Sequence, residues 1–113
     1  MQSKTISIVI PIYNEAPNVT PLYKTLTSTI RSLPHQFELI FVDDGSSDDS
    51  VKKLRQVARK DKRAKVIELA RNFGKEIAVT AGLHKAKGDA AIIMDADLQH
   101  PPELLPQFVN EWE

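Results

Sequence analysis

Short apolar runs alternate with helical patterns along this 113-residue chain, and that alternation restricts its fold more than any other feature. The runs are dense in Ile, Val, Leu and Ala and lack the polar alternation of a half-solvated strand. Such runs are typical of a parallel sheet that is covered on both faces. They predict strands at Ile6–Ile12, Phe37–Val42, Lys65–Ala70 and Ala90–Met94.

Helical patterns fill the intervals between the predicted strands. The first should end before Pro34, and its apolar stripe is Val19, Leu22, Leu26, Ile30 and Leu33. The second carries a shorter stripe of Val51, Leu54, Val57 and Ala58, with Ser47 or Asp48 as the predicted N-cap. The third runs from about Lys75 to Lys87, and its residues small enough for close approach to a sheet are Ala78, Ala81 and Gly82.

A last helical segment follows the paired prolines and reaches Trp112. Strand and helix thus alternate three times before a fourth strand and a partial helix. Because crossovers between parallel strands are right-handed, we expect an α/β fold with a doubly wound, mostly parallel sheet and helices on both faces. The length fits one domain.

Composition excludes several classes of function. Lys plus Arg and Asp plus Glu each number 15, so no net charge indicates a nucleic-acid partner. The absence of Cys excludes a disulfide scaffold and a Cys nucleophile. Neither a P-loop nor the GxGxxG dinucleotide motif is present. No apolar stretch is long enough to cross a bilayer, which predicts a soluble, cytoplasmic chain as written.

Polar side chains follow each predicted strand, at the edge of the sheet where α/β folds bind ligands. Asp95 and Asp97, with the amide of Gln99, form an oxygen-rich group suited to Mg²⁺ or Mn²⁺. The alternative is that Asp95 and Asp97 are a pair of solvated turn residues.

Asp43 and Asp44 follow the second strand, where carboxylates can accept hydrogen bonds from a ribose hydroxyl or a base N–H. The alternative is that they serve the turn and the cap of the next helix.

Tyr13 and Glu15 add an aromatic face and a further acceptor after the first strand, or they form an ordinary exposed turn. A basic run between Lys52 and Lys65 has two interpretations as well. It could bind phosphate or lipid headgroups, but a solvated helix face is the simpler interpretation.

Three strings together resemble the N-terminal half of a family 2 inverting glycosyltransferase: Val9-Ile10-Pro11-Ile12-Tyr13-Asn14-Glu15, Asp43-Asp44-Gly45-Ser46 and Asp95-Ala96-Asp97. The strings Arg71-Asn72-Phe73-Gly74-Lys75-Glu76 and Asp95 to Glu103 are similar to the branch that transfers sugars to polyprenyl phosphates, such as the dolichol-phosphate mannosyltransferases.

The resemblance implies the nucleotide-binding half of a glycosyltransferase A-type fold. It implies a UDP- or GDP-sugar donor bound by Pro11, Tyr13, Glu15, Val42, Asp43, Asp44, Asp95 and Ala96. It also implies Mg²⁺ or Mn²⁺ held by Asp97 and Gln99, and diphosphate contacts from Arg71 and Lys75. The complete protein would transfer the sugar to a lipid phosphate at the cytoplasmic face of a membrane, in glycolipid or cell-envelope synthesis.

The resemblance also implies that the 113 residues are one truncated catalytic half, inactive alone, with no catalytic residue of its own identified. With strand order 3-2-1-4, Ala90–Met94 would lie at an edge and favour self-association. The alternatives are a non-catalytic nucleotide-diphosphate-binding module, a receiver-like domain that holds Mg²⁺ and a nucleotidyltransferase.

Overall fold

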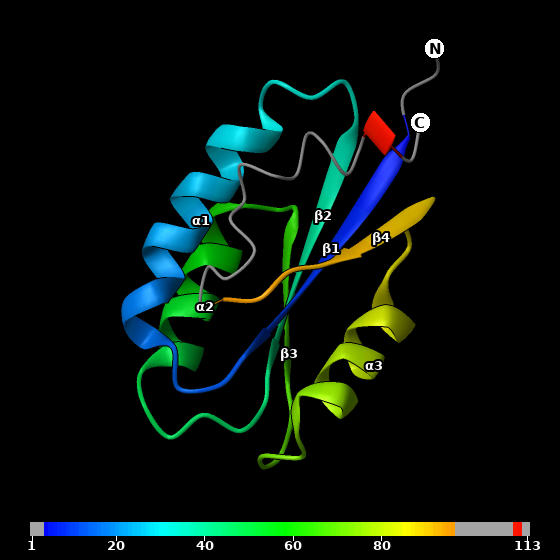
Figure 1. Ribbon diagram of the computed structural model, residues 1–113. Coiled ribbons are helices and arrows are strands. Elements are labelled where there is room, and N and C mark those ends of the chain that lie inside the picture. The colour runs from blue at the N-terminus through cyan, green and yellow to red at the C-terminus, as the bar shows by residue number, and fades with distance from the viewer. Residues whose placement is uncertain (1–3, 97–109, 112–113) are drawn as a thin grey trace.

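Four strands and three helices alternate along the chain in the computed structural model, which describes residues 4–96 and 110–111 (Figure 1). They are β1 (Thr5–Ile12), α1 (Ala16–Ile30), β2 (Gln36–Asp43), α2 (Ser50–Lys60), β3 (Ala64–Glu68), α3 (Lys75–Lys85) and β4 (Ala90–Ile93). The predicted order of elements is confirmed. Of the predicted last helix, only Asn110 and Glu111 are described, and both are helical.

The strands form one parallel sheet in the order β3-β2-β1-β4, as predicted. At the centre, Ile8 pairs with Leu39 on one side and with Ile92 on the other. Since all four strands run in the same direction, β1, β2 and β4 end at the same edge of the sheet. The order also differs from that of receiver domains, in which the third strand lies beside the first, so the receiver-like alternative is wrong.

Helices cover both faces of the two central strands: α1 and α2 lie on one face, and α3 lies on the other (Figure 1). Alternate residues of a strand point to opposite faces, and the two apolar clusters follow that rule. The larger cluster joins Ile6, Ile8, Ile10 and Ile12 to α1 and α2, and the smaller joins Val9, Ile40 and Val42 to Ala78 of α3.

Small residues let α3 approach the sheet closely, as predicted. Ala78 and Gly82 are buried against β1 and β2. A Cβ atom at Gly82 would lie 2.4 Å from Cγ1 of Val9, so no larger residue fits without displacing the helix or the strand.

A buried polar group interrupts the apolar face beneath the end of α3. The Ser7 hydroxyl donates to Glu38 at 2.7 Å, and the Lys87 N–H donates to the same carboxylate oxygen at 2.9 Å. Burial alone would raise the pKa of Glu38, but these hydrogen bonds and one from Lys65 hold the pKa below its usual value. The group is satisfied internally and lies at the amino ends of the strands.

Several predicted boundaries are wrong by a few residues. α1 ends at Ile30, because the chain turns there, although Leu33 still packs against the core. β3 ends at Glu68, and β4 ends one residue before Met94. α2 has Asp49 as its N-cap, without a side-chain cap bond.

Cover on both faces is confirmed for β1 and β2 but not for β4. Ala91 and Ile93 are exposed, with Ile93 46% accessible, because α3 lies against β1 and β2 and leaves this face of β4 open. Among the described helices, none has the length and apolar character required to cross a bilayer.

Candidate functional site

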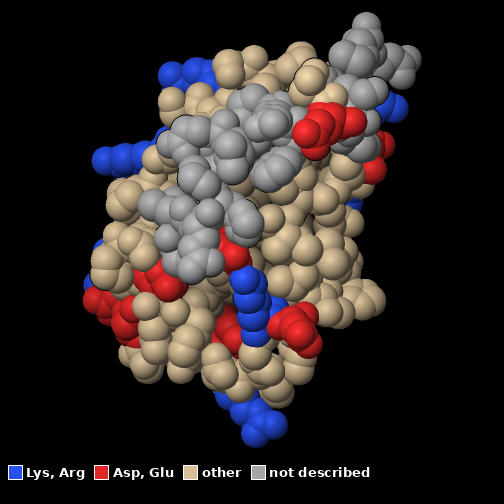
Figure 2. All heavy atoms as spheres, in the orientation of Figure 1, with Lys and Arg blue, Asp and Glu red and all other residues tan. Residues whose placement is uncertain are grey.

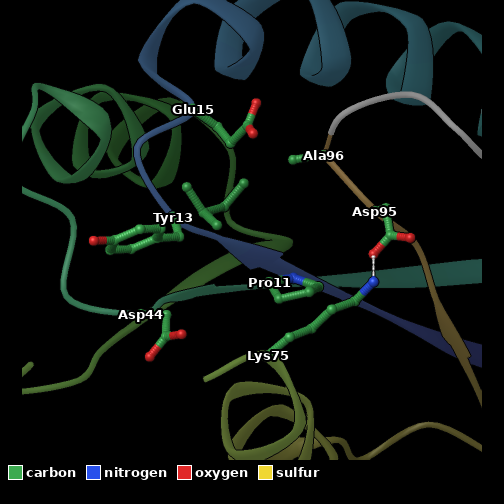
Figure 3. A pocket seen from close by; sticks show the side chains of 8 residues that line it. Pro11, Tyr13, Glu15, Asp44, Lys75, Asp95 and Ala96 are labelled. Atoms are coloured by element: carbon green, nitrogen blue, oxygen red, sulfur yellow. Dashed lines mark ion pairs between the residues drawn. The ribbon is translucent and has the colours of Figure 1, made fainter. Parts of the chain in front are cut away.

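The carboxyl ends of β1, β2 and β4 surround a hollow of about 270 Å³ (Figure 3). It lies where strand order reverses, since the chain runs outward from β1 to β3 and then returns to the other side of β1. In open α/β sheets, ligands bind at this point. The lining residues are Pro11, Ile12, Tyr13, Glu15, Asp44, Lys75, Asp95 and Ala96.

Charged side chains dominate the rim of this hollow. Glu15, Asp44 and Asp95 bring three carboxylates from three separate segments, and Lys75 brings one ammonium. Nζ of Lys75 lies 2.5 Å from Oδ1 of Asp95, which is the ion pair drawn in Figure 3. On the face seen in Figure 2, acidic side chains lie around a basic one near the strand ends. The described part of the rim is therefore net acidic.

Tyr13 supplies the aromatic surface of the hollow. Its side chain is 47% exposed. In Figure 3 the ring lies on the same side of the hollow as Asp44, across from the Lys75–Asp95 pair. An exposed ring beside a polar hollow is available for stacking on a flat ligand.

Asp44 holds the loop that follows β3. Its carboxylate accepts hydrogen bonds from the N–H groups of Phe73 (2.8 Å) and Gly74 (3.1 Å) and from the Asn72 amide (3.2 Å). Next to it, Gly45 has φ +76°, and a Cβ there would lie 2.3 Å from the carbonyl carbon of Arg71. The loops after β2 and β3 thus meet at a seam that excludes any side chain at residue 45.

Asp43 differs sharply from its neighbour. It is 2% exposed, and its Oδ2 accepts from the Ser46 N–H at 3.0 Å. Its Oδ1 has no hydrogen-bond partner among the described residues. A buried carboxylate oxygen without a donor is costly. Although Asp43 was predicted to contact the nucleotide, it does not line the hollow, whereas the adjacent Asp44 does.

Asn14 and Asp48 join the loops after β1 and β2, a role that the sequence analysis missed. Asn14 has φ +52°, and its side-chain oxygen accepts from the Ser47 N–H at 2.8 Å. Asp48 accepts from the N–H groups of Ala16 and Ser50. Burial would raise the pKa of Asp48, but these bonds and the Ser50 hydroxyl keep it below its usual value. An Asn two residues after the end of a strand was the available signal, since Asn tolerates positive φ.

The remaining predicted site residues lie elsewhere. Val42 is fully buried in the α3 cluster and does not line the hollow. Arg71 lies over the ring of Phe73, 4.9 Å from its centroid, and is also absent from the lining. Asp97 and Gln99 fall outside the described residues.

The chemistry of the rim fits a hard divalent cation, although the described residues supply only part of a site. Within residues 4–96 and 110–111, no three His, Cys, Asp or Glu side chains form a metal-binding group. Asp95 offers a carboxylate oxygen of the kind that Mg²⁺ and Mn²⁺ prefer, and in this structure that oxygen pairs with the Lys75 ammonium.

A family model, glycosyl transferase family 2, matches residues 7–113. The chain belongs to this family. The family resemblance drawn from the sequence motifs is therefore confirmed.

Curated relatives give a finer comparison. The chain is 44% identical over 107 residues to the undecaprenyl-phosphate 4-deoxy-4-formamido-L-arabinose transferase of Pseudomonas savastanoi pv. phaseolicola, covering 94% of this chain and 32% of the relative. It is 41% identical over 114 residues to the dodecaprenyl-phosphate galacturonate synthase of Rhizobium johnstonii, covering 100% and 34%. The chain spans about a third of the length of the curated relatives it matches.

Solved structures share the fold. A mannosyltransferase from Pyrobaculum calidifontis, in complex with GDP-Man and Mn²⁺, superposes with a TM-score of 0.83 at 23% identity, over 99% of this chain and 33% of that one. The glucosyl-3-phosphoglycerate synthase of Mycobacterium tuberculosis, in complex with Mn²⁺, UDP and glucosyl-3-phosphoglycerate, has a TM-score of 0.76 at 26% identity, over 96% and 39%. The fold is thus that of glycosyltransferases of the A type, of which the chain covers about a third.

Substituting Asp44 by Ala should loosen the loop after β3. Without the carboxylate, the N–H groups of Phe73 and Gly74 lose their acceptor, and we expect a loss of about 2 kcal/mol in the free energy of unfolding. Amide hydrogen exchange at residues 72–74 should accelerate. The control is Asp49→Ala, whose side chain makes no cap bond; equal exchange in both variants would contradict this assignment of Asp44.

Proposed function

We propose that this chain binds a nucleotide-diphosphate sugar together with Mg²⁺ or Mn²⁺, and that the complete protein transfers the sugar with inversion to a polyprenyl phosphate. The observation that carries the proposal is the convergence of Glu15, Asp44 and Asp95 with Lys75 around one hollow. Three carboxylates and one ammonium form a poor site for a bare diphosphate. They form a suitable one for a diphosphate that arrives with a divalent cation.

The donor's nucleoside fits the side of the hollow formed by Tyr13 and the loop after β2. The exposed Tyr13 ring offers a stacking surface, and Glu15 offers an acceptor for ribose. Of the two adjacent aspartates, we assign the base N–H to Asp43, because its Oδ1 has no donor within the part of the chain that the structure describes, while Asp44 is engaged by the loop after β3. Pro11, Asp95 and Ala96 would line the ribose and diphosphate, and Val42 would support them from the core.

Asp97 and Gln99 would hold the cation beside Asp95, as the resemblance implies. The cation would offset charge on the departing nucleoside diphosphate. The related synthase in complex with Mn²⁺ and UDP, at 26% identity, supports the choice of a divalent cation together with a nucleoside diphosphate. The base and sugar of the donor are left open between UDP- and GDP-sugars.

Lipid phosphate is the acceptor that the relatives favour, since two of them are named for sugar transfer to undecaprenyl phosphate and for a dodecaprenyl-phosphate product. An acceptor phosphate oxygen would form its bond to the anomeric carbon as the bond from that carbon to the diphosphate breaks. Because that oxygen is already ionised at neutral pH, the chain needs no general base for this step. We place the complete protein at the cytoplasmic face of a membrane on the same ground.

A non-catalytic nucleotide-binding module is the competing function. It would use the same hollow but form no product. A transfer assay with UDP- or GDP-sugars and polyprenyl phosphate separates the two, and it requires the complete protein because the 113 residues correspond to about a third of each relative.

The position of β4 at one end of the sheet formed by the described strands supports a second proposal, that the 113-residue chain self-associates. Ile93 and Ala91 are exposed on this edge strand, and strand edges with apolar side chains can pair with another chain.

Replacing Asp97 by Ala should remove the metal-dependent part of nucleotide binding. We expect UDP or GDP affinity in the presence of Mn²⁺ to fall about tenfold or more, and affinity in EDTA to stay unchanged. Titration calorimetry measures both values. An unchanged affinity in Mn²⁺ would mean that Asp97 is an ordinary turn residue.

Replacing Asp43 by Ala should weaken nucleotide binding with and without metal, by about tenfold, because a hydrogen bond to a charged acceptor is lost. Asp49→Ala, an exposed carboxylate in the same loop region, is the matched control. If Asp43→Ala binds both nucleotides as the wild type does, the base pocket lies elsewhere.

Replacing Ile93 by Lys should convert a self-associating chain into a monomer, since a charge on an edge strand opposes strand pairing. Ile77→Lys is the control, because Ile77 is equally exposed, at 50%, but lies on α3. Sedimentation velocity across a concentration series measures the effect. A wild-type chain that stays monomeric at high concentration would refute the proposal.

A further inference from the structure

Lys65, the last residue of the basic run that begins at Lys52, does not share a surface with the rest of that run. It lies on β3 and pairs in register with Ile40, whose side chain belongs to the apolar cluster beneath α3. Because residues in register on neighbouring strands point to the same face of a sheet, Lys65 projects on the α3 side. The helix that carries most of the run, α2, covers the opposite face (Figure 1).

Three lysines border a second hollow, of about 290 Å³, between β3 and the end of α3. They are Lys65, Lys85 at the end of α3 and Lys87 between α3 and β4, and the other lining residues are Val66 and Ile67. Among the described residues, no acidic side chain lines this hollow. Lys65 is near the start of β3 and Lys87 precedes β4, so the hollow lies toward the amino ends of the strands, away from the candidate donor site.

We propose that this lysine hollow binds a phosphate group that carries two negative charges, either as inorganic phosphate or as the monoester headgroup of a lipid. The carboxylate of Glu38 offsets the charge of Lys65, so three ammonium groups and one carboxylate leave two positive charges. A phosphate monoester carries about −1.5 to −2 at pH 7. The proposal uses neither the metal nor the nucleotide of the proposed function.

The buried carboxylate of Glu38 holds one wall of the lysine hollow in place. It accepts from the Lys87 N–H at 2.9 Å and from the Lys65 ammonium, while the Ser7 hydroxyl beside it accepts from the Gly88 N–H at 2.9 Å. A lysine ammonium has three N–H donors, so the bond to Glu38 leaves two of them for a ligand. Glu38 itself is not among the lining residues.

The ammonium groups of Lys85 and Lys87 lack partners of their own. Both residues are exposed, and neither side chain makes an ion pair or hydrogen bond within residues 4–96 and 110–111. The helix dipole favours a cation in the last turn of α3, which accounts for Lys85. It does not account for Lys87, beyond the helix, or for Lys65, on a strand. Because like charges at one place repel, an anion bound among them would be stabilised by all three.

The edge of β3 adds a backbone donor to the lysine hollow. The carbonyl of Arg63 and the N–H of Leu69 both bond to β2. Since the N–H groups of successive strand residues point to alternate sides, the N–H of Val66 points away from β2. Among the described strands, β3 has no neighbour on that side. Backbone N–H groups and ammonium groups are the donors that phosphate oxygens accept from.

The test uses two double variants of the 113-residue chain that lose the same charge. Lys85→Met with Lys87→Met removes the two lysines without partners, and Lys52→Met with Lys60→Met removes two exposed lysines of α2 as the matched control. Inorganic phosphate is titrated at low ionic strength, which limits screening, and amide chemical shifts in NMR spectra locate its site. For the lipid source, each chain is sedimented with phosphatidylcholine vesicles that contain or lack phosphatidic acid.

We expect phosphate to shift the amide signals of Val66, Lys87 and Gly88, and the variant without Lys85 and Lys87 to bind it at least about tenfold more weakly. The control should match the wild type. Vesicle binding that needs phosphatidic acid and is lost in the same variant assigns the lipid headgroup as the source, whereas binding of free phosphate alone assigns a soluble one.

Three results would overturn the proposal. They are the absence of binding to both probes, an equal loss in the control variant, and chemical shifts confined to the carboxyl ends of the strands, near Tyr13. Since neither probe contains a nucleotide or a divalent cation, these results leave the proposed function untouched, and failure of the proposed function leaves the lysine hollow untouched.

Discussion

Parallel pairing of β1 with β2 and with β4 is the constraint on which the rest of the structure depends. Both faces of β1 and β2 are buried, so a shift in register would expose apolar side chains of the core. Once the register is set, the carboxyl ends of the three strands must lie at one edge. The polar loops that follow these strands therefore lie side by side at that edge and surround the hollow. The position of the hollow is thus fixed by the packing of the apolar core, although the core residues themselves lie elsewhere in the sheet.

Electrostatic balance at that edge explains how so many carboxylates coexist. Asp44 is satisfied by backbone N–H groups, Asp48 by the starts of two helices, and Asp95 by an ammonium. The carboxylates at this edge therefore have partners before any ligand binds, and Glu15 likewise accepts from the Asn18 amide. Among the described residues, Oδ1 of Asp43 is the buried side-chain atom that has no hydrogen-bond partner.

Sequence patterns were sufficient for the existence of the four strands and the polar residues that follow them, because each strand is an apolar run; burial on both faces holds only for the central strands β1 and β2. The strand order came with the family resemblance. The patterns were sufficient for the small face of α3 as well. They could not separate Asp43 from Asp44, since two adjacent carboxylates differ only in what the loop after β3 brings to one of them. The N-cap at Asp49 and the pairing of Lys75 with Asp95 likewise depend on loop geometry, which no local periodicity encodes.

The seam at Gly45 has a consequence for how this site can diversify. Both the left-handed backbone of Gly45 and the closeness of Arg71 forbid a side chain at residue 45. A change in the backbone path of one of the two loops therefore requires a matching change in the other. Tyr13 is under no such restriction, because half of its ring faces solvent. Engineering of donor preference should therefore begin with Tyr13, the ring that a nucleobase would touch, and leave Gly45 unchanged.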